Sequence, residues 1–159
     1  MRVKDVMTRY PVCCVSDDTV QAVAQTLRNE DIGSMPVVAD GESQRLEGII
    51  TDRDLCCSII AAGLDPKTTP VGPFVTRDPV ICRPEQSLDS CERLMQTHRI
   101  RRIPVVDDEA RCIGILSQAD LARSEDAPKV HMTVAEISRP SLAIIMPAPS
   151  TQSLWSLTT

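Results

Sequence analysis

The stretch that decides the fold is Leu46-Glu47-Gly48-Ile49-Ile50-Thr51-Asp52-Arg53-Asp54-Leu55, which recurs 66 positions later as Cys112-Ile113-Gly114-Ile115-Leu116-Ser117-Gln118-Ala119-Asp120-Leu121. In each copy an apolar run with a glycine near its start ends at a hydroxyl residue, and a carboxylate follows three positions later. This pattern predicts a strand that leads into the first turn of a helix. Such a helix N-terminus carries unpaired backbone N–H groups and the positive end of the helix dipole. The sequence therefore offers two candidate anion sites.

The hydroxyl and the carboxylate of each copy allow two interpretations. Thr51 with Asp54, and Ser117 with Asp120, fit a capping box, in which each side chain bonds the other residue's backbone N–H. Alternatively, the hydroxyl faces a phosphate while the carboxylate accepts hydrogen bonds from a ribose, as acidic residues do in other nucleotide sites. Taken alone, these residues favour capping, because the capping box is common.

Composition limits the classes of protein and partner. A chain of 159 residues is long enough for one domain or for two small lobes that share a core. The core must be aliphatic, because the only aromatic residues are Tyr10, Phe74 and Trp155. Few aromatic residues and a net charge of -5 argue against nucleic acid as a partner.

Other features concern the compartment and metal binding. No segment reaches the roughly 18 apolar residues of a membrane span, and the N-terminus lacks the apolar core of a signal peptide. We therefore expect a cytoplasmic protein that does not bind membranes. The seven cysteines include no Cys-x-x-Cys pair, so no metal site is predicted, and most lie in apolar runs that suit burial in a reducing compartment.

Both copies of the motif belong to longer repeats. Thr8-Arg9-Tyr10-Pro11-Val12 matches Thr76-Arg77-Asp78-Pro79-Val80, and a helix and a short proline-bearing strand are predicted after each. The helices are indicated by apolar residues at helical spacing: Val20, Val23, Ala24 and Leu27 in one repeat, and Leu88, Cys91, Leu94 and Met95 in the other. A further helix after the first motif is predicted to be lined by Leu55, Ile59 and Ala62 and capped by Gly63.

Each repeat is therefore predicted as strand, helix, strand, strand, helix, which gives an α+β fold. We place repeat 1 at residues 1–63, a proline-bearing linker at 64–70 and repeat 2 at 71–126. One repeat cannot bury its apolar face alone, so the pair is the folding unit. Residues 127–159 are expected to form a partly ordered C-terminal tail, and no helix is predicted in it.

Together these motifs resemble cystathionine-β-synthase (CBS) domains in tandem, a pair called a Bateman module. The resemblance covers residues 1–126 and rests on the doubled opening motif and on Val6-Met7-Thr8, Phe74-Val75-Thr76, Met35-Pro36-Val37-Val38 and Ile103-Pro104-Val105-Val106. It implies two packed repeats with pseudo-twofold symmetry and two clefts between them, which bind adenine nucleotides in many members. It therefore shifts the preference from capping to ligand binding.

The resemblance also implies which residues bind ligand, because each cleft takes its hydroxyl and carboxylate from one repeat and its other strands from the second. One cleft is expected to combine Thr51 and Asp54 with Thr76, Val80, Arg101, Arg102, Ile103 and Pro104. The other is expected to combine Ser117 and Asp120 with Thr8, Val12, Gly33, Ser34, Met35 and Pro36.

The two clefts are not expected to be equivalent. Arginine pairs with phosphate at close range, so the assignment of Arg101 and Arg102 predicts that phosphate-rich nucleotides bind first at the cleft of Asp54. Gln118-Ala119 replaces Asp52-Arg53 in the second copy, so that cleft is expected to take a less charged ligand or none.

The sequence thus predicts a stand-alone regulatory module that senses an adenine nucleotide and signals to an unidentified protein. It is not predicted to be an enzyme or to need a cofactor, because His98 and His131 lack a partner at a catalytic spacing and no Gly-rich phosphate loop occurs. A redox sensor at Cys13-Cys14 or Cys56-Cys57 is a weaker alternative, and a ligand-independent dimerisation module is another. A homodimer is expected, head-to-head or head-to-tail, and the ligand stays open among AMP, ADP, ATP, NAD and S-adenosylmethionine-like molecules.

Overall fold

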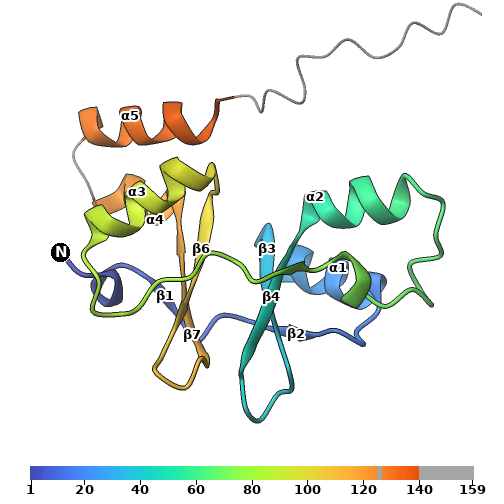
Figure 1. The fold of residues 1–159 in the computed structure, drawn as a ribbon. Coiled ribbons are helices and arrows are strands. Elements are labelled where there is room, and N and C mark those ends of the chain that lie inside the picture. Colours follow the sequence, from blue (N-terminus) through green and yellow to red (C-terminus); the bar gives the residue numbers. More distant parts are fainter. Residues whose placement is uncertain (125–126, 140–159) are drawn as a thin grey trace, which may run out of the picture.

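The computed structural model describes residues 1–124 and 127–139 and has two lobes side by side (Figure 1). The first lobe contains a sheet in the order β2-β3-β4-β5 with helices α1 and α2, and the second contains a sheet in the order β1-β7-β6 with helices α3, α4 and α5. The predicted α+β class is confirmed.

The elements follow one another in the order that two repeats require. They are η1 (Val3–Asp5), β1 (Thr8–Arg9), β2 (Cys14–Val15), α1 (Val20–Asn29), β3 (Ser34–Val38), β4 (Leu46–Thr51), α2 (Asp52–Asp54), η2 (Leu55–Ile60), η3 (Gly72–Phe74), β5 (Thr76–Arg77), α3 (Leu88–His98), β6 (Arg102–Val106), β7 (Cys112–Ser117), α4 (Gln118–Ser124) and α5 (Ala127–Ile137).

Each lobe takes an edge strand from the other half of the chain. β1 pairs with β7 in antiparallel fashion, with Thr8 opposite Ile115, and β5 pairs with β4, with Thr76 opposite Ile49. The turns before these strands are exchanged as well, because Val3 is fully buried in the core of the second lobe. The lobes in space therefore differ from the repeats in sequence, and neither lobe is complete without the other repeat.

Strands β3 and β6 separate a core face from a face that looks toward the boundary between the lobes. Met35 and Val37 of β3 lie in the core of the first lobe. Because side chains alternate along a strand, Ser34 and Pro36 project from the opposite face. β6 repeats the arrangement, with Ile103 in the core of the second lobe. The faces turned away from the two cores are thus available to build a site between the lobes.

The second helix of the first repeat differs from its prediction at one position. Leu55 and Ile59 are buried as predicted, but Ala62 is exposed. After α2 the chain continues as the π-helical turn η2, in which the N–H of Ala61 bonds the carbonyl of Cys56 at 3.0 Å. A π-turn holds more residues than an α-turn, so the residues after Ile59 rotate out of the apolar face. Ala24 of α1, predicted on the buried face, is also exposed, because Val20, Val23 and Leu27 suffice to cover the sheet.

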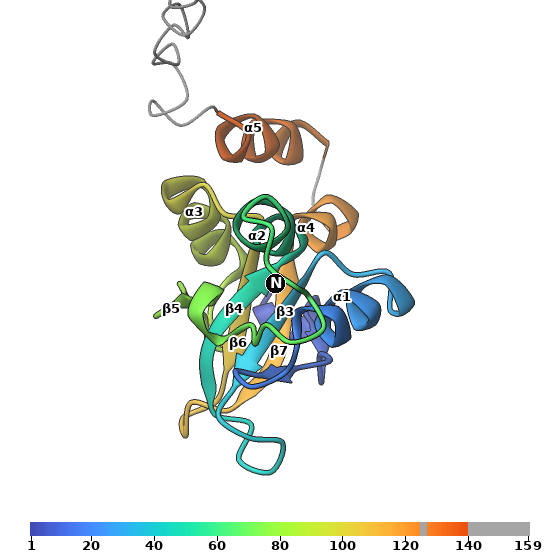
Figure 2. The ribbon, with the colours of Figure 1, turned by 90° about the vertical axis from the view of Figure 1, so that its right-hand side faces the viewer.

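Helix α5 was not predicted, yet it packs against α3 and α4 of the second lobe (Figures 1 and 2). Ile137 belongs to the core of that lobe. The buried hydroxyl of Thr133 donates to the carboxylate of Glu92 and accepts from the side-chain amide of Gln96 at 2.8 Å. The rest of the expected tail, residues 140–159, lies outside the described residues. None of the helices in the described part is long and apolar enough to cross a bilayer.

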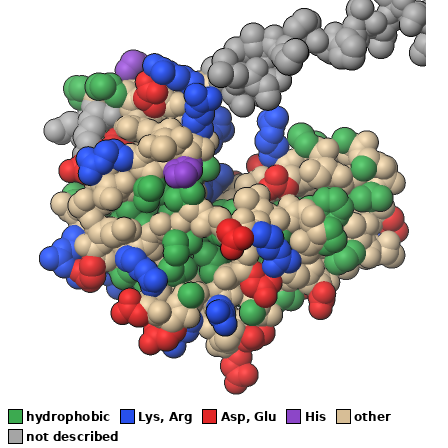
Figure 3. Space-filling model, viewed as in Figure 1, with side chains coloured by type: hydrophobic (Ala, Val, Ile, Leu, Met, Phe, Trp, Pro, Cys, Tyr) green, Lys and Arg blue, Asp and Glu red, His purple; other side chains and the backbone are tan. Residues whose placement is uncertain are grey.

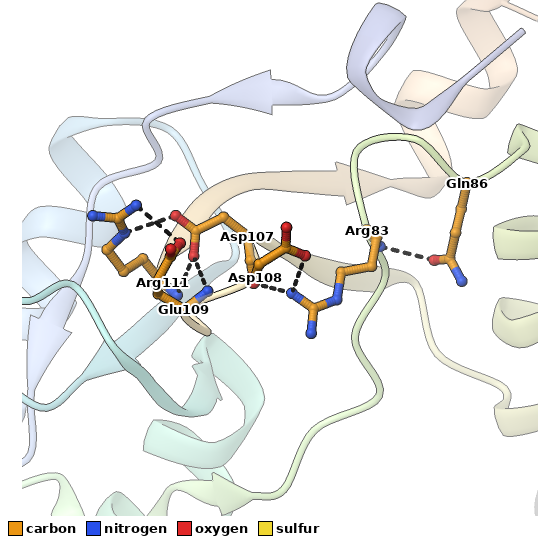
Figure 4. Close-up of polar contacts among 6 residues, drawn as sticks. All are labelled: Arg83, Gln86, Asp107, Asp108, Glu109 and Arg111. Atoms are coloured by element: carbon orange, nitrogen blue, oxygen red, sulfur yellow. Dashed lines mark hydrogen bonds and ion pairs between the residues drawn. The ribbon is translucent and has the colours of Figure 1, made fainter.

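Ion pairs fix the loop between β6 and β7 (Figure 4). The guanidinium of Arg111 donates to Asp107 at 2.7 Å and to Glu109 at 3.1 Å, and Arg83 pairs with Asp108 at 3.7 Å. All of these side chains except that of Asp107 are largely exposed, so these pairs contribute little to stability. We assign this charged cluster to loop structure and not to a binding site.

The tips of the two hairpins are joined by backbone hydrogen bonds. The N–H of Leu46 donates to the carbonyl of Ala110 at 3.0 Å, and the N–H of Cys112 donates to the carbonyl of Gln44 at 2.8 Å. This junction fixes the two lobes relative to each other at one end of their boundary.

Candidate ligand-binding site

A pocket of about 710 Å³ lies at the boundary between the lobes, and this volume is within the range of small-molecule sites. Its walls come from β1 and the segment after it, from the end of α1 and the start of β3, and from β6, β7 and α4. The lining residues are Thr8, Tyr10, Pro11, Val12, Glu30, Asp31, Ile32, Gly33, Ser34, Pro36, Arg101, Arg102, Ile115, Ser117, Gln118, Ala119, Asp120, Ala122 and Arg123. In the space-filling view, a notch between the lobes has basic side chains beside it on the left and a basic and an acidic side chain on the right (Figure 3). This view faces α3 and β5, whereas α1 and α4, which border the pocket, lie on the far side (Figure 2).

Ser117 and Asp120 form a complete capping box on the pocket wall. The backbone N–H and the hydroxyl of Ser117 donate to Asp120 Oδ2 at 2.8 and 2.6 Å, and the N–H of Asp120 donates back to Ser117 Oγ at 3.2 Å. The second carboxylate oxygen, Oδ1, accepts from Arg123 at 2.5 Å. Asp120 is 6% exposed, so its carboxylate is held in one orientation beside the pocket.

Thr51 and Asp54 form the same box in the first repeat. The N–H and the hydroxyl of Thr51 donate to Asp54 Oδ2 at 2.9 and 2.7 Å, and the N–H of Asp54 donates to Thr51 Oγ1 at 3.2 Å. The capping interpretation therefore holds for both motifs. Among the residues that line the described pocket, however, only the second motif is present.

Arg101 and Arg102 line the pocket of Asp120, although the sequence assigned them to the cleft of Asp54. Arg102 extends across the boundary, since a Cβ atom at Gly33 would lie 2.9 Å from its Nη2 atom. Only a residue without a side chain lets the guanidinium approach this closely. The predicted difference in charge between the clefts is therefore revised, because the two arginines add positive charge to the pocket of Asp120.

Neither arginine is neutralised by a carboxylate in an ion pair within residues 1–124 and 127–139. The pocket is also lined by Glu30 and Asp31, whose side chains are exposed. It therefore offers donors for an anion and acceptors for hydroxyl groups.

The other predicted site residues divide into two groups. Thr8, Val12, Gly33, Ser34 and Pro36 line the pocket with Ser117 and Asp120, as predicted for that cleft. The side chains of Met35 and Ile103 instead lie in the two cores, at 1% and 0% exposure, because strand alternation turns them away from the boundary. The remaining predicted residues, which do not line this pocket, are Thr51, Asp54, Thr76, Val80 and Pro104.

The sequence also matches a known family along most of its length. The sequence profile of the CBS domain matches residues 3–60 and 71–126. The chain belongs to the CBS domain family. The predicted resemblance is thus confirmed, and the two matched segments are the two repeats.

One relative of this CBS pair is a mycobacterial protein. Hypoxic response protein 1 of Mycobacterium tuberculosis is 36% identical over 120 residues, which cover 76% of this chain and 82% of the relative. A crystal structure of hypoxic response protein I with two coordinated zinc ions superposes with a TM-score of 0.71 at 33% identity, over 79% of this chain and 100% of that one.

Two solved CBS pairs contain adenosine compounds. The CBS domain pair of MJ0100, in complex with 5′-methylthioadenosine and S-adenosyl-L-methionine, has a TM-score of 0.69 at 27% identity, over 78% of this chain and 94% of that one. CBSX2 of Arabidopsis thaliana in complex with AMP has a TM-score of 0.66 at 28% identity, over 77% and 94% of the two chains.

The sequence analysis did not predict several of the residues that line the pocket of the CBS pair. Tyr10, which is 83% exposed and has a φ of +50°, is at the pocket rim, and Arg123 pairs with Asp120. A usable signal existed for Arg123, because Asp120 and Arg123 stand at the i, i+3 spacing of helical ion pairs. No local signal places Glu30 and Asp31, since they reach the pocket only through the packing of the lobes.

The cysteines of the CBS pair give little support to a redox or metal centre. All seven thiols are free, and burial raises the pKa of Cys14 to about 12, which disfavours the reactive thiolate. A hydrogen bond with Cys112 lowers the pKa of Cys13. In the part of the chain that the structure describes, no group of three or more His, Cys, Asp and Glu side chains is placed to hold a metal ion.

Proposed function

We propose that this CBS pair binds an adenine nucleotide in the pocket of Ser117 and Asp120 and reports its occupancy to another protein. The observation that carries the proposal is one pocket of suitable volume that contains a buried carboxylate and the guanidinium groups of Arg101 and Arg102, which have no ion-pair partner within residues 1–124 and 127–139. A carboxylate accepts hydrogen bonds from a ribose diol, and guanidinium groups bind phosphate. AMP in CBSX2 supports a nucleotide ligand, and the two compounds in MJ0100, which have no phosphate, support its adenosine part.

Ligand entry requires one exchange of partners at Asp120. Its Oδ2 atom is used by the capping box, while its Oδ1 atom is bonded by Arg123, whose side chain is 72% exposed. The Arg123 side chain is exposed and can turn into solvent, and ribose hydroxyls that take its place at this oxygen keep the buried carboxylate hydrogen-bonded. The released guanidinium then adds a third positive group for the phosphate.

A second, weaker site is proposed at the cleft of Thr51 and Asp54. This cleft has the same capping box, and Thr76 is exposed on the adjacent strand β5. Val80, Pro104 and the backbone at Met35 and Ile103 are candidates to line the two clefts. Because Arg102 extends toward the pocket of Asp120, we expect the nucleotide to fill that pocket first.

The proposed activity is binding without chemical conversion, so AMP, ATP or NAD is expected to stay intact during binding. Signalling would proceed through a change in how the two lobes meet, because the ligand contacts both of them. The alternative from the sequence, a ligand-independent dimerisation module, predicts that no adenosine compound stabilises the protein.

We expect Arg102→Ala to weaken AMP binding about tenfold or more and to leave adenosine binding nearly unchanged. A hydrogen bond to a charged group contributes about 1.5–3 kcal/mol. Adenosine has no phosphate, so it makes no such bond with Arg102 and cannot lose this contribution. Calorimetry with both ligands tests this, and Arg93→Ala on the exposed side of α3 is the matched control. An equal loss for adenosine would mean that Arg102 supports the fold, which would contradict the assignment.

We also expect a homodimer formed through helix faces. Ile60 of η2 and Met132 of α5 are 54% and 68% exposed, and Leu64 in the segment after η2 is 40% exposed, so apolar surface remains for a second copy to cover. Light scattering at micromolar concentration should give twice the chain mass, and Ile60→Asp should shift the protein toward the monomer. A monomer mass for the unmodified protein would contradict this expectation.

A further inference from the structure

The hydroxyl of Ser34, a residue that lines the pocket, makes no hydrogen bond with the described residues. Ser34 is 4% exposed, and its Oγ atom is the only fully buried side-chain N or O atom without a hydrogen-bond partner in the described residues. A buried hydroxyl without a partner destabilises a protein, and native structures rarely keep one without a reason. A polar ligand atom in the pocket would satisfy it.

The strand places this hydroxyl on the pocket side. Ser34 is the first residue of β3, and the next residue, Met35, points into the core of the first lobe. Side-chain alternation therefore turns Ser34 and Pro36 toward the boundary, and both line the pocket. The unpaired hydroxyl and the pocket thus lie on the same face of the sheet.

Arg102 occupies the position in the second repeat that Ser34 occupies in the first. Each is the first residue of its proline-bearing strand, and each pairs across its hairpin with the hydroxyl residue of the capping box: Ser34 with Thr51, and Arg102 with Ser117. The guanidinium of Arg102 lies against Gly33, the residue next to Ser34. The two matching positions therefore meet at one place in the pocket.

We propose that Ser34 and Arg102 together form a phosphate subsite, in which the Ser34 hydroxyl sets the preference of the pocket for a nucleotide over its nucleoside. A guanidinium has donors and no acceptor, so the group that satisfies both side chains is an acceptor with negative charge. A phosphate oxygen meets this requirement, whereas a ribose hydroxyl or a ring nitrogen is uncharged and cannot form an ion pair with Arg102. This inference rests on the proposed function and adds a selectivity residue to it.

Ser34→Ala separates this role from a structural one, because it should change free and bound protein in opposite directions. The free protein should melt roughly 2–6 °C higher, since the variant removes an unsatisfied buried hydroxyl. Its affinity for AMP should fall roughly five- to tenfold, while its affinity for adenosine should stay within about twofold. Ser58→Ala, on the exposed side of η2, is the control and should change neither quantity.

Calorimetry and thermal melts should be run with AMP, adenosine and inorganic phosphate alone. A lower melting temperature of free Ser34→Ala would show that the hydroxyl has a partner and would overturn the proposal, as would an unchanged ratio of AMP to adenosine affinity. If AMP fails to bind the unmodified protein but phosphate stabilises it and Ser34→Ala abolishes that effect, the subsite stands and the nucleotide assignment fails. If AMP binds but Ser34→Ala leaves the ratio of AMP to adenosine affinity unchanged, the nucleotide assignment stands and the subsite is wrong.

Discussion

Asp120→Ala is expected to weaken AMP binding by about 100-fold or more, the largest effect of any single substitution in the pocket. The carboxylate would accept hydrogen bonds from the ribose, and two charge-assisted bonds of about 1.5 kcal/mol each correspond to that factor. Adenosine should lose the same factor, because it presents the same ribose. Calorimetry with both ligands measures the loss, and it distinguishes this variant from Arg102→Ala, which acts on the phosphate alone.

Asp54→Ala is the matched control for this substitution. It removes the same capping box from the first repeat, so both variants should lose about 0.5–2 kcal/mol of unfolding free energy. Only Asp120→Ala should lose the tighter AMP site. If Asp54→Ala removes the tighter site and Asp120→Ala leaves it intact, the nucleotide binds at the other cleft and the assignment of the pocket is wrong.

Gly48→Ala is expected to have the largest effect on stability, about 3 kcal/mol of unfolding free energy. A Cβ atom at Gly48 would lie 2.3 Å from a methyl carbon of Val75 and 2.6 Å from the backbone oxygen of Thr76. Thr76 belongs to the exchanged strand β5, which pairs with β4 at this point. The backbone cannot move away without breaking that pairing, so the first lobe would lose its borrowed strand.

The second repeat contains its own control, Gly114→Ala. There the added Cβ would lie 2.5 Å from the sulfur of Met7 and 3.2 Å from the backbone oxygen of Thr8. A methionine side chain is flexible and can move aside, so we expect a cost of only about 1 kcal/mol. Urea denaturation of both variants measures the two costs. Equal costs would mean that the exchanged strand β5 is not held against Gly48 in solution.

The parts of the fold that the sequence predicted are those with local causes. The doubled motif predicts the strand and helix start because hydroxyl and carboxylate are only three positions apart, and both capping boxes form. Helix α5 was missed because Pro128 near its start argues against a helix, and because the apolar spacing of Val130, Val134 and Ile137 gains its meaning only when α3 and α4 lie beside it. The exposure of Ala62 depends on a π-turn, which side-chain periodicity does not reveal.

The kinds of residue in the candidate site could be predicted from the sequence, but not all of the residues that meet in the pocket. The capping-box pair and the strand residues around Gly33 and Ser34 were predicted to share a cleft and do share one. The direction taken by Arg102 was not predictable, because it depends on the close approach of two segments that are far apart in sequence. An unpaired hydroxyl such as that of Ser34 is likewise visible only once its neighbours are placed.

A crystal structure of the protein grown with AMP would test the central claim most directly. We expect one nucleotide in the pocket between the lobes, with its ribose hydroxyls within hydrogen-bonding distance of Asp120 and its phosphate at Arg102 and Ser34. A nucleotide bound only at Thr51 and Asp54, or density for AMP at neither cleft despite saturating ligand, would contradict the account.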